Sequence, residues 1–188
     1  MIGPITRLTV LAACCGLLLS TVYALTRDDI EANRTAFARR QLLAVVNDAG
    51  ARLTPIGKDL YAVEKEGRRR GYVFETTTGK GYNGTIELWL GVNLQGRITG
   101  VRVKSHQETP GIGDKIEIAV SDWIDSFRGK SLDNPDAAGW KVRKDGGTFD
   151  QFTGATITPR AVVGAVRQGL ERAAAKRDDW RQRTGTGP

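Results

Sequence analysis

The sequence predicts an α+β protein: a single N-terminal transmembrane helix followed by a domain with an antiparallel sheet and flanking helices. Two observations predict this fold class. An uncharged run occupies residues 8–26, and the segments that follow alternate in the manner of strands before they become helix-periodic. Segregated strands and helices are typical of α+β folds. The 188 residues are enough for one such domain with an accessory segment.

The uncharged run, LTVLAACCGLLLSTVYALT, would be about 28 Å long as a helix, close to the ~30 Å hydrocarbon core of a membrane. A cleaved signal peptide with its cleavage site at 22–24 would use the same run, and so would a lipoprotein signal at Cys14. We expect an anchor, because a removed signal would not leave Met1 and the apolar run before Cys14 is short. Both cysteines, Cys14 and Cys15, lie in this run, so none is left for a disulfide in the domain.

The chain is expected to divide into five parts, which are a short tail (1–7), the anchor (8–26), an amphipathic connecting helix (27–50), the folded domain (51–178) and a flexible tail (179–188). Strands are expected at 60–64, 72–78, 85–92 and 97–104, the last two as a hairpin. Helices are expected at 114–127 and 159–176, and between them residues 140–144 are expected to form either a short strand or an extended approach to the turn at 150. Thr158 fits the N-cap of the last helix, and Pro159 fits its first position.

The net charge of +7 is spread along the chain rather than clustered with aromatic residues, which argues against a nucleic-acid-binding protein. A basic surface of this kind suits anionic lipid headgroups or an acidic partner. His106 is the only histidine, so a zinc or iron–sulfur site built by the domain is not expected. No Gly-x-Gly-x-x-Gly follows a predicted strand, so direct NAD binding is not expected either.

The segment Asp150-Gln-Phe-Thr-Gly-Ala-Thr156 stands directly before the last predicted helix. Bare N–H groups at a helix start favour a phosphate group, and Gly154 and Ala155 leave the backbone open there. The hydroxyls of Thr153 and Thr156 belong to the same neighbourhood. By itself the segment could equally be an ordinary loop and helix cap with no bound phosphate. No residue of the segment is an evident base for a threonine hydroxyl, so Thr156 is not expected to react unaided.

This segment resembles the flavinylation motif of the FMN-binding domain family, an aspartate followed by Ser/Thr-Gly-Ala-Thr. Three further segments resemble the same family in the same order along the chain. They are Gly81-Tyr-Asn-Gly84, in which Thr85 replaces the family's proline, His106-Gln-Glu-Thr-Pro-Gly-Ile-Gly113, and Trp123 with Phe127-Arg-Gly-Lys130. The resemblance implies that FMN is joined to Thr156 through a phosphoester bond by a separate flavin transferase, with Asp150 used in recognition during attachment.

The resemblance also implies flavin contacts from the glycine-rich loops, and the candidate residues are Tyr82, Asn83, Gly84, Glu108, Thr109 and Gly111. Tyr82 is a candidate either for covering a ring face or for capping the core. Glu108 is expected to support its loop, because a carboxylate beside a reduced, anionic flavin would disfavour that state. His106 is expected to be a structural hydrogen-bonding residue rather than a proton relay.

Among members of the family, the chain most resembles the G subunits of Rnf complexes. The resemblance implies an electron-carrier subunit of an ion-translocating ferredoxin:NAD oxidoreductase, an enzyme of the translocase class, with other membrane subunits as partners. Three alternatives stay open: the related C subunit of sodium-pumping NADH:quinone reductase, a stand-alone extracytoplasmic FMN reductase or electron shuttle, and an anchored binding module without flavin.

The orientation of the domain is the point on which charge and resemblance disagree. Arg27, Arg34, Arg39 and Arg40 follow the uncharged run and only Arg7 precedes it, so the positive-inside rule favours a cytoplasmic domain. The resemblance implies a single-pass protein of the bacterial inner membrane with its FMN domain on the periplasmic side. We follow the resemblance.

Overall fold

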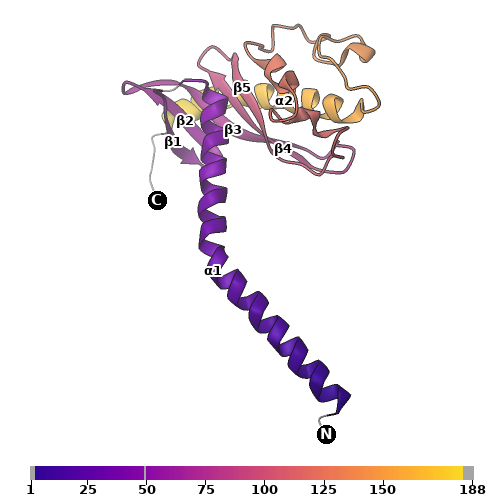
Figure 1. Ribbon diagram of the computed structural model, residues 1–188. Helices are drawn as coiled ribbons and strands as arrows, with labels where there is room; N and C mark the ends of the chain where they lie inside the picture. The colour runs from indigo at the N-terminus through magenta and orange to yellow at the C-terminus, as the bar shows by residue number, and fades with distance from the viewer. Residues whose placement is uncertain (1–2, 49, 184–188) are drawn as a thin grey trace. The chain divides into compact units, whose positions relative to one another are not determined.

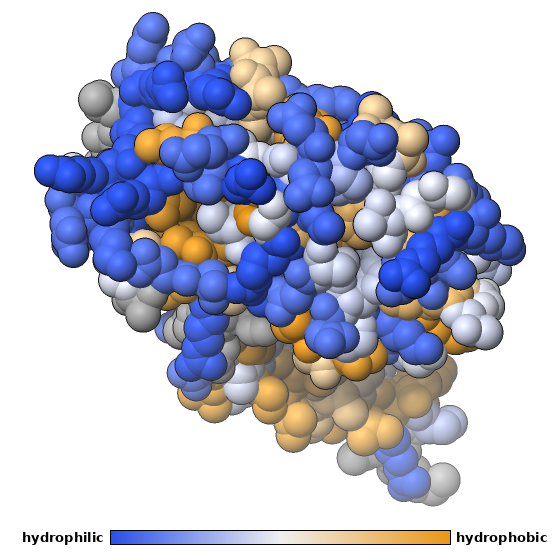
Figure 2. All heavy atoms as spheres, turned by 90° about the horizontal axis from the view of Figure 1, so that it is seen from above, coloured by the Kyte–Doolittle hydropathy of each residue, from blue (hydrophilic) through white to orange (hydrophobic). Residues whose placement is uncertain are grey.

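A computed structural model describes residues 3–48 and 50–183, apart from the side chains of residues 31–39 (Figure 1). The chain divides into two compact units, Met1–Arg39 and Arg40–Pro188, which are described separately. Figure 2 shows a face of the second unit on which hydrophilic residues predominate and apolar side chains form only small patches.

Helix α1 (Pro4–Val46) begins in the first unit and ends in the second. Its stretch Pro4–Ile30 is long and apolar enough to cross a membrane. The large apolar side chains of this stretch are exposed, as Leu17 is at 70%, and a lipid environment requires such a surface. The helix is continuous through residues 8–26 and onward to Val46, where Asn47 takes a positive φ of 52° and ends it.

The second unit is built on an antiparallel sheet whose five strands follow one another in chain order. The strands are β1 (Arg52–Gly57), β2 (Leu60–Lys65), β3 (Arg68–Thr78), β4 (Ile86–Asn93) and β5 (Ile98–Ser105). The predicted α+β class is confirmed, and so is the β4–β5 hairpin. β1 was not predicted, because Pro55 and the scarcity of β-forming residues hide it in the sequence.

One face of the sheet is covered by helix α2 (Ile157–Ala175). The fit is close at Gly169, where a Cβ would lie 2.6 Å from Leu90 Cδ2, so a larger residue at this helix position would collide with β4. Nearby, the buried Thr76 donates a hydrogen bond to the carbonyl of Ala165 at 3.2 Å. These contacts fix the position of α2, and therefore of its first turn, against β3 and β4.

The other face of the sheet holds a second, smaller core formed by Leu42, Val45 and Val46 of α1 with Val63, Val73 and Trp89. The paired glycines Gly91 of β4 and Gly100 of β5 make room for the end of α1. A Cβ on Gly91 would lie 2.6 Å from Val45 Cγ1, and a Cβ on Gly100 would lie 2.7 Å from the Val45 carbonyl oxygen. We call Gly91 and Gly100 the glycine notch.

The predicted helix at 114–127 is wrong. The segment forms two short 3-10 helices, η1 (Asp114–Ile116) and η2 (Asp122–Phe127), separated by a turn. Ser121 explains the break, because its hydroxyl donates to the Lys115 carbonyl at 2.6 Å and accepts from the Trp123 N–H at 3.3 Å. Of the two alternatives for residues 140–144, the short strand is not formed: the 3-10 helix η3 (Arg143–Asp145) occupies part of the segment, and Val142 alone bridges to Phe149.

The predicted flexible tail is wrong for residues 179–182, which belong to the short helix α3 (Arg177–Gln182). Trp180 is buried there against Tyr72 and Phe74 of β3, at ring-centroid distances of 5.4 and 4.9 Å. Arg69 of β3 donates to the carbonyl oxygens of residues 180, 181 and 183, which caps the helix end. Residues 184–188 of the predicted tail lie outside the described residues.

Candidate functional site

Three loops that are far apart in the sequence meet at one pocket of about 270 Å³. Its lining residues are Tyr82 from the β3–β4 loop, Glu108, Thr109, Ile112 and Gly113 from the loop after β5, and Gly154, Ala155, Thr156, Ile157 and Thr158 at the start of α2. The structure therefore brings together six of the candidate flavin-site residues, which are Tyr82, Glu108, Thr109, Gly154, Ala155 and Thr156. Asn83, Gly84, Gly111, Asp150 and Thr153 do not line the pocket themselves.

Thr156 is the residue directly before α2, with φ −74° and ψ −24°. Its side chain makes no capping hydrogen bond, it is half-buried, and it lines the pocket. Gly154 has a positive φ of 81°, which an L side chain rarely adopts, and this turn brings the chain to Thr156. The Thr156 hydroxyl is therefore left for contact with whatever the pocket holds.

Thr158 is not the N-cap that its position before Pro159 predicts. Helix α2 begins at Ile157, so Thr158 lies inside the first turn, and its side chain is 1% exposed. Its hydroxyl donates a short hydrogen bond to Glu108 Oε2 instead of to the helix backbone. Pro159 remains in the first turn, where its missing N–H would have no helical partner.

Glu108 is the most connected side chain of the site and is 4% exposed. Besides the Thr158 hydroxyl, its carboxylate accepts the backbone N–H of Asn83 at 3.1 Å. The Asn83 side-chain amide in turn donates to Thr109 Oγ1 at 3.1 Å. Glu108 is thus bonded to the β3–β4 loop and to the first turn of α2, contacts that suit a residue supporting its loop.

The glycines of the motifs create the space for this carboxylate. A Cβ on Gly81 would lie 2.7 Å from Glu108 Oε1, and a Cβ on Gly113 would lie 2.9 Å from Glu108 Cβ. Gly111 has a different role, since its φ of 76° requires glycine, and its N–H donates to Asp114 Oδ2 at 2.8 Å. Packing around Glu108 and backbone conformation thus explain why the loops are rich in glycine, and no direct contact between glycine and a ligand is needed for the explanation.

His106 uses both of its ring nitrogens within the protein. Nδ1 accepts the backbone N–H of Glu108 at 2.9 Å, so Nε2 carries the proton that it shares with Glu117 at 2.5 Å. A ring held in this way is unsuited to passing protons to a ligand. The structure supports the expected structural role, in which His106 fixes the loop that carries Glu108.

Asp150 lies at the surface, away from the pocket lining. Its carboxylate pairs with Arg143 Nε at 3.1 Å, and both side chains are about two-thirds exposed. Its backbone carbonyl accepts the indole N–H of Trp123 at 2.9 Å, which connects the start of the motif to η2. The exposed carboxylate is accessible to another protein, whereas the backbone of the motif is held in place.

Apolar side chains surround the opening of the pocket. Tyr82, Ile112 and Ile157 are 68%, 49% and 45% exposed, and all three line it. Large apolar side chains at a pocket are typical of a site for a flat, partly apolar ligand. Ile112 and Ile157 are not among the candidates from the sequence; Ile112 lies inside a motif and Ile157 directly follows one, and nothing in the sequence indicates that they are exposed.

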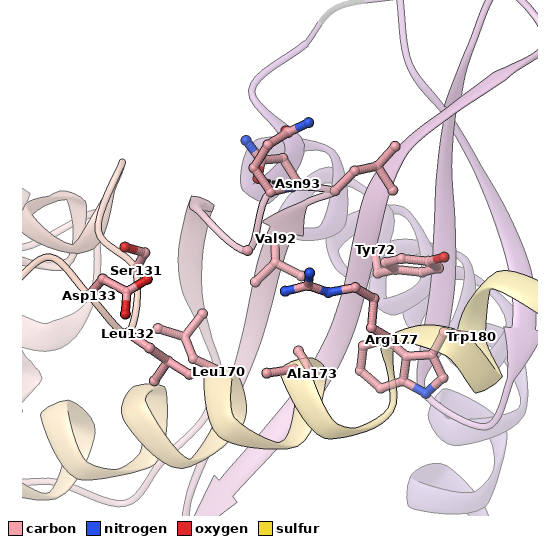
Figure 3. Close-up of a pocket in the computed structure, with 14 residues that line it drawn as sticks. Tyr72, Val92, Asn93, Ser131, Leu132, Asp133, Leu170, Ala173, Arg177 and Trp180 are labelled. Carbon is pink, nitrogen blue, oxygen red and sulfur yellow. Dashed lines mark hydrogen bonds between the residues drawn. The ribbon is translucent and has the colours of Figure 1, made fainter.

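A second pocket, shown in Figure 3, lies between the ends of β3 and β4 and the α2–α3 junction, where the Arg177 side chain extends beside Val92. Its volume is about 90 Å³, well below the ~300 Å³ at which sites for drug-sized ligands begin. None of the residues of the motifs lines it. The pocket at Thr156 is therefore the better candidate for a cofactor.

Comparison with known proteins agrees with this placement. A family model described as the FMN-binding domain matches residues 81–171, which include all three loops of the pocket. The G subunit of the ion-translocating oxidoreductase complex of Pseudomonas aeruginosa is 52% identical over 118 residues, covering 63% of this chain and 55% of that protein. The chain thus spans about half the length of this relative.

Two other relatives, each named as the G subunit of the same kind of complex, align over a greater length. The protein of Aliivibrio fischeri is 40% identical over 183 residues, covering 87% of this chain and 85% of its own. That of Haemophilus influenzae is 40% identical over 171 residues, covering 84% and 83%. The chain belongs to the family of ion-translocating oxidoreductase complex G subunits and contains their FMN-binding domain.

Proposed function

We propose that the chain is a membrane-anchored electron carrier that holds one FMN through a phosphoester bond to Thr156. Bound FMN would supply reversible transfer of one or two electrons. The protein's part is to retain the cofactor and to present it, and a covalent bond through the phosphate retains FMN without altering the ring. No residue of the chain is assigned a catalytic role.

The single observation that carries the proposal is the placement of Thr156 relative to the other motif threonines. Thr156 lines the pocket without a capping hydrogen bond, whereas Thr158 is buried and bonded to Glu108. Thr153 is exposed and does not line the pocket. Of the three hydroxyls, the one at Thr156 best combines accessibility with contact to the pocket.

The residues present fit a flavin. Tyr82, Ile112 and Ile157 offer apolar surface to a ring, and the start of α2 favours the negative phosphate. The exposure of Tyr82, Ile112 and Ile157 leaves the site open at the surface, which suits a carrier whose cofactor must reach a partner's cofactor. Thr109, Asn83, Gly84 and Gly111 then shape the loops around the ring.

We further propose that the chain works in an Rnf-type ferredoxin:NAD oxidoreductase, as a single-pass protein of the bacterial inner membrane with its domain on the periplasmic side. Other membrane subunits would exchange electrons with it, and a separate transferase would attach the FMN, using Asp150 for recognition. The names of the relatives support a complex of this kind. The exposed apolar side chains of Pro4–Ile30 support the anchor.

The test is the intact mass of the chain extracted from membranes of cells that hold the transferase. The wild type should carry the mass of one FMN less one water, and its denatured band should fluoresce under ultraviolet light. Thr156→Val should be folded and colourless, while Thr153→Val should keep the flavin. Attachment at Thr156 is wrong if the Thr156→Val chain still carries the added mass.

A further inference from the structure

A buried carboxylate between two loops carries one inference beyond the attachment itself. Glu108 has two oxygens, and each accepts a hydrogen bond from a different neighbouring element. Oε2 binds the hydroxyl of Thr158 in the first turn of α2, and Oε1 binds the N–H of Asn83 in the β3–β4 loop. No lysine or arginine pairs with this carboxylate among the residues that the structure describes.

We propose that Glu108 and Thr158 form a latch that positions Thr156 for flavin attachment and sets the width of the pocket. Glu108 is then a positioning residue that acts through Thr158 and not by touching the flavin. The latch's effect on attachment rests on the proposed function, since it presumes that Thr156 carries FMN. The latch's effect on the backbone of the flavin-free protein does not depend on the proposed function.

The position of Thr158 makes the latch effective. Thr158 is two residues from Thr156 and belongs to the first turn of α2, so the backbone at residue 158 and the backbone at residue 156 move together. The helix body is held against β3 and β4 by Gly169 and the Thr76–Ala165 hydrogen bond. Its first turn has no side-chain cap at Thr156, and the bond from the Thr158 hydroxyl to Glu108 ties this turn to the loop after β5.

The other half of the latch fixes the opposite wall of the pocket. Asn83 follows Tyr82 directly, so the bond from its N–H to Glu108 holds the turn that presents the tyrosine ring. Since Gly81 and Gly113 enclose the carboxylate, it has little room to change rotamer. The Glu108 side chain therefore holds the loop of Tyr82 and the helix start next to Thr156 at a fixed separation.

A carboxylate suits this place because it accepts at both oxygens and donates nothing. Removing the Thr158 hydroxyl leaves a buried oxygen without a donor, and such a loss is unfavourable because the group is shielded from water. The carboxylate would then draw away from α2 or admit water. In either case the first turn of α2 loses its hydrogen bond to the loop after β5.

The latch is tested first on the full-length chain without flavin, produced in cells that lack the transferase and purified in detergent. Thr158→Val should raise amide hydrogen exchange of residues 160–163, whose N–H groups bond back to the start of α2, about tenfold, whereas Thr158→Ser, which keeps the hydroxyl, should exchange like the wild type. Thr54→Val is the matched control, because Thr54 also donates to a glutamate, Glu64, at 3.2 Å and lies in β1. It should leave the exchange of residues 160–163 unchanged.

A second variant separates the latch from a general packing defect. Glu108→Ala should raise the same exchange, and Glu108→Ala with Thr158→Val should be no worse than the more affected single variant, because both remove one interaction. Additive effects of the two changes, or equal exchange in Thr158→Val and Thr158→Ser, overturn the latch.

The attachment arm measures the fraction of chain that carries FMN, by intact mass after coexpression with the transferase. Thr158→Val should lower this fraction several-fold, and Thr158→Ser should restore it. Full attachment to Thr158→Val, together with raised exchange, would refute positioning for attachment. A wild type without FMN would instead contradict the proposed function, while the exchange results still decide whether the latch exists.

Discussion

Gly100 is the position at which one added methyl group should displace the end of α1 from the sheet. A Cβ there would lie 2.7 Å from the carbonyl oxygen of Val45 and 3.1 Å from its Cα. Both are backbone atoms, so a change of rotamer does not relieve the overlap, and the helix end has to move. Overpacking of this kind costs about 1–3 kcal/mol. The melting temperature of a domain of this size falls by ~2–4 °C for each kcal/mol, so Gly100→Ala should lower it by several degrees.

Gly91, the other residue of the glycine notch, should respond differently to a compensating change. Its Cβ would lie 2.6 Å from Val45 Cγ1, a side-chain atom, and close to the rotatable hydroxyl of Thr99. Val45→Ala removes Cγ1 and should therefore rescue part of the loss in Gly91→Ala. It should not rescue Gly100→Ala, because the backbone of residue 45 stays in place, and the two losses should add.

The assay is thermal unfolding followed by circular dichroism in detergent, with amide exchange of residues 42–46 as a local measurement. Gly100→Ala should show both a lower melting temperature and faster exchange at the helix end. Wild-type behaviour of Gly100→Ala in both measurements would refute the reasoning. So would equal rescue of both glycine variants by Val45→Ala.

Three further predictions concern other parts of the domain. Arg160 donates two hydrogen bonds to Asp145, at 2.7 and 2.9 Å, and these hold the pKa of the Asp145 carboxyl below its usual value. The pair therefore stabilises the fold at a pH above the ordinary Asp pKa, and this stabilisation is lost as the pH falls through the lowered pKa. Arg160→Met should raise the Asp145 pKa measured by NMR titration, and an unchanged pKa would contradict the pair. Trp180→Ala should lower the free energy of unfolding by about 3–5 kcal/mol and release α3, measured by urea unfolding, while Trp180→Phe should lose much less. Tyr82→Leu should raise the fluorescence yield of attached flavin with little change in melting temperature, because Tyr82 is exposed; an unchanged yield would show that its ring does not stack on the flavin.

The strands were predictable from the sequence where apolar residues recur at every second position. β4 alternates Ile86, Leu88 and Leu90 with residues of the other face, and this period of two gives the strand and its register. β1 contains a proline and has a single fully buried residue, Ile56, so the pattern is absent. Its pairing with β2 arises from the tertiary structure alone.

The helix predicted over 114–127 shows the limit of apolar periodicity. Ile116, Trp123, Ile124 and Phe127 are buried as a helix would bury them, but two short 3-10 helices achieve the same burial. The difference is made by the hydroxyl of Ser121, which bonds to the backbone on either side of the turn. Serine has this ability in any sequence, so its presence did not indicate the break.

The residues of the site were mostly available from motif resemblance, but their arrangement was not. Thr158 before Pro159 satisfies every local rule for an N-cap, and a partner 50 residues away, Glu108, changes its role. Contacts of this range depend on how the sheet positions the loops. The same contacts give the pocket its shape. The sequence therefore predicted the class of ligand but not the geometry of the site.

β4 has a further consequence, because its consecutive residues Leu90 and Gly91 meet different helices on opposite faces. Leu90 meets Gly169 of α2, and Gly91 meets Val45 at the end of α1. Even a methyl group is too large for either contact, so neither helix can shift along β4 without moving the strand. The helix that begins next to Thr156 and the last turn of α1 therefore pack on opposite faces of one strand, separated by a single layer of backbone.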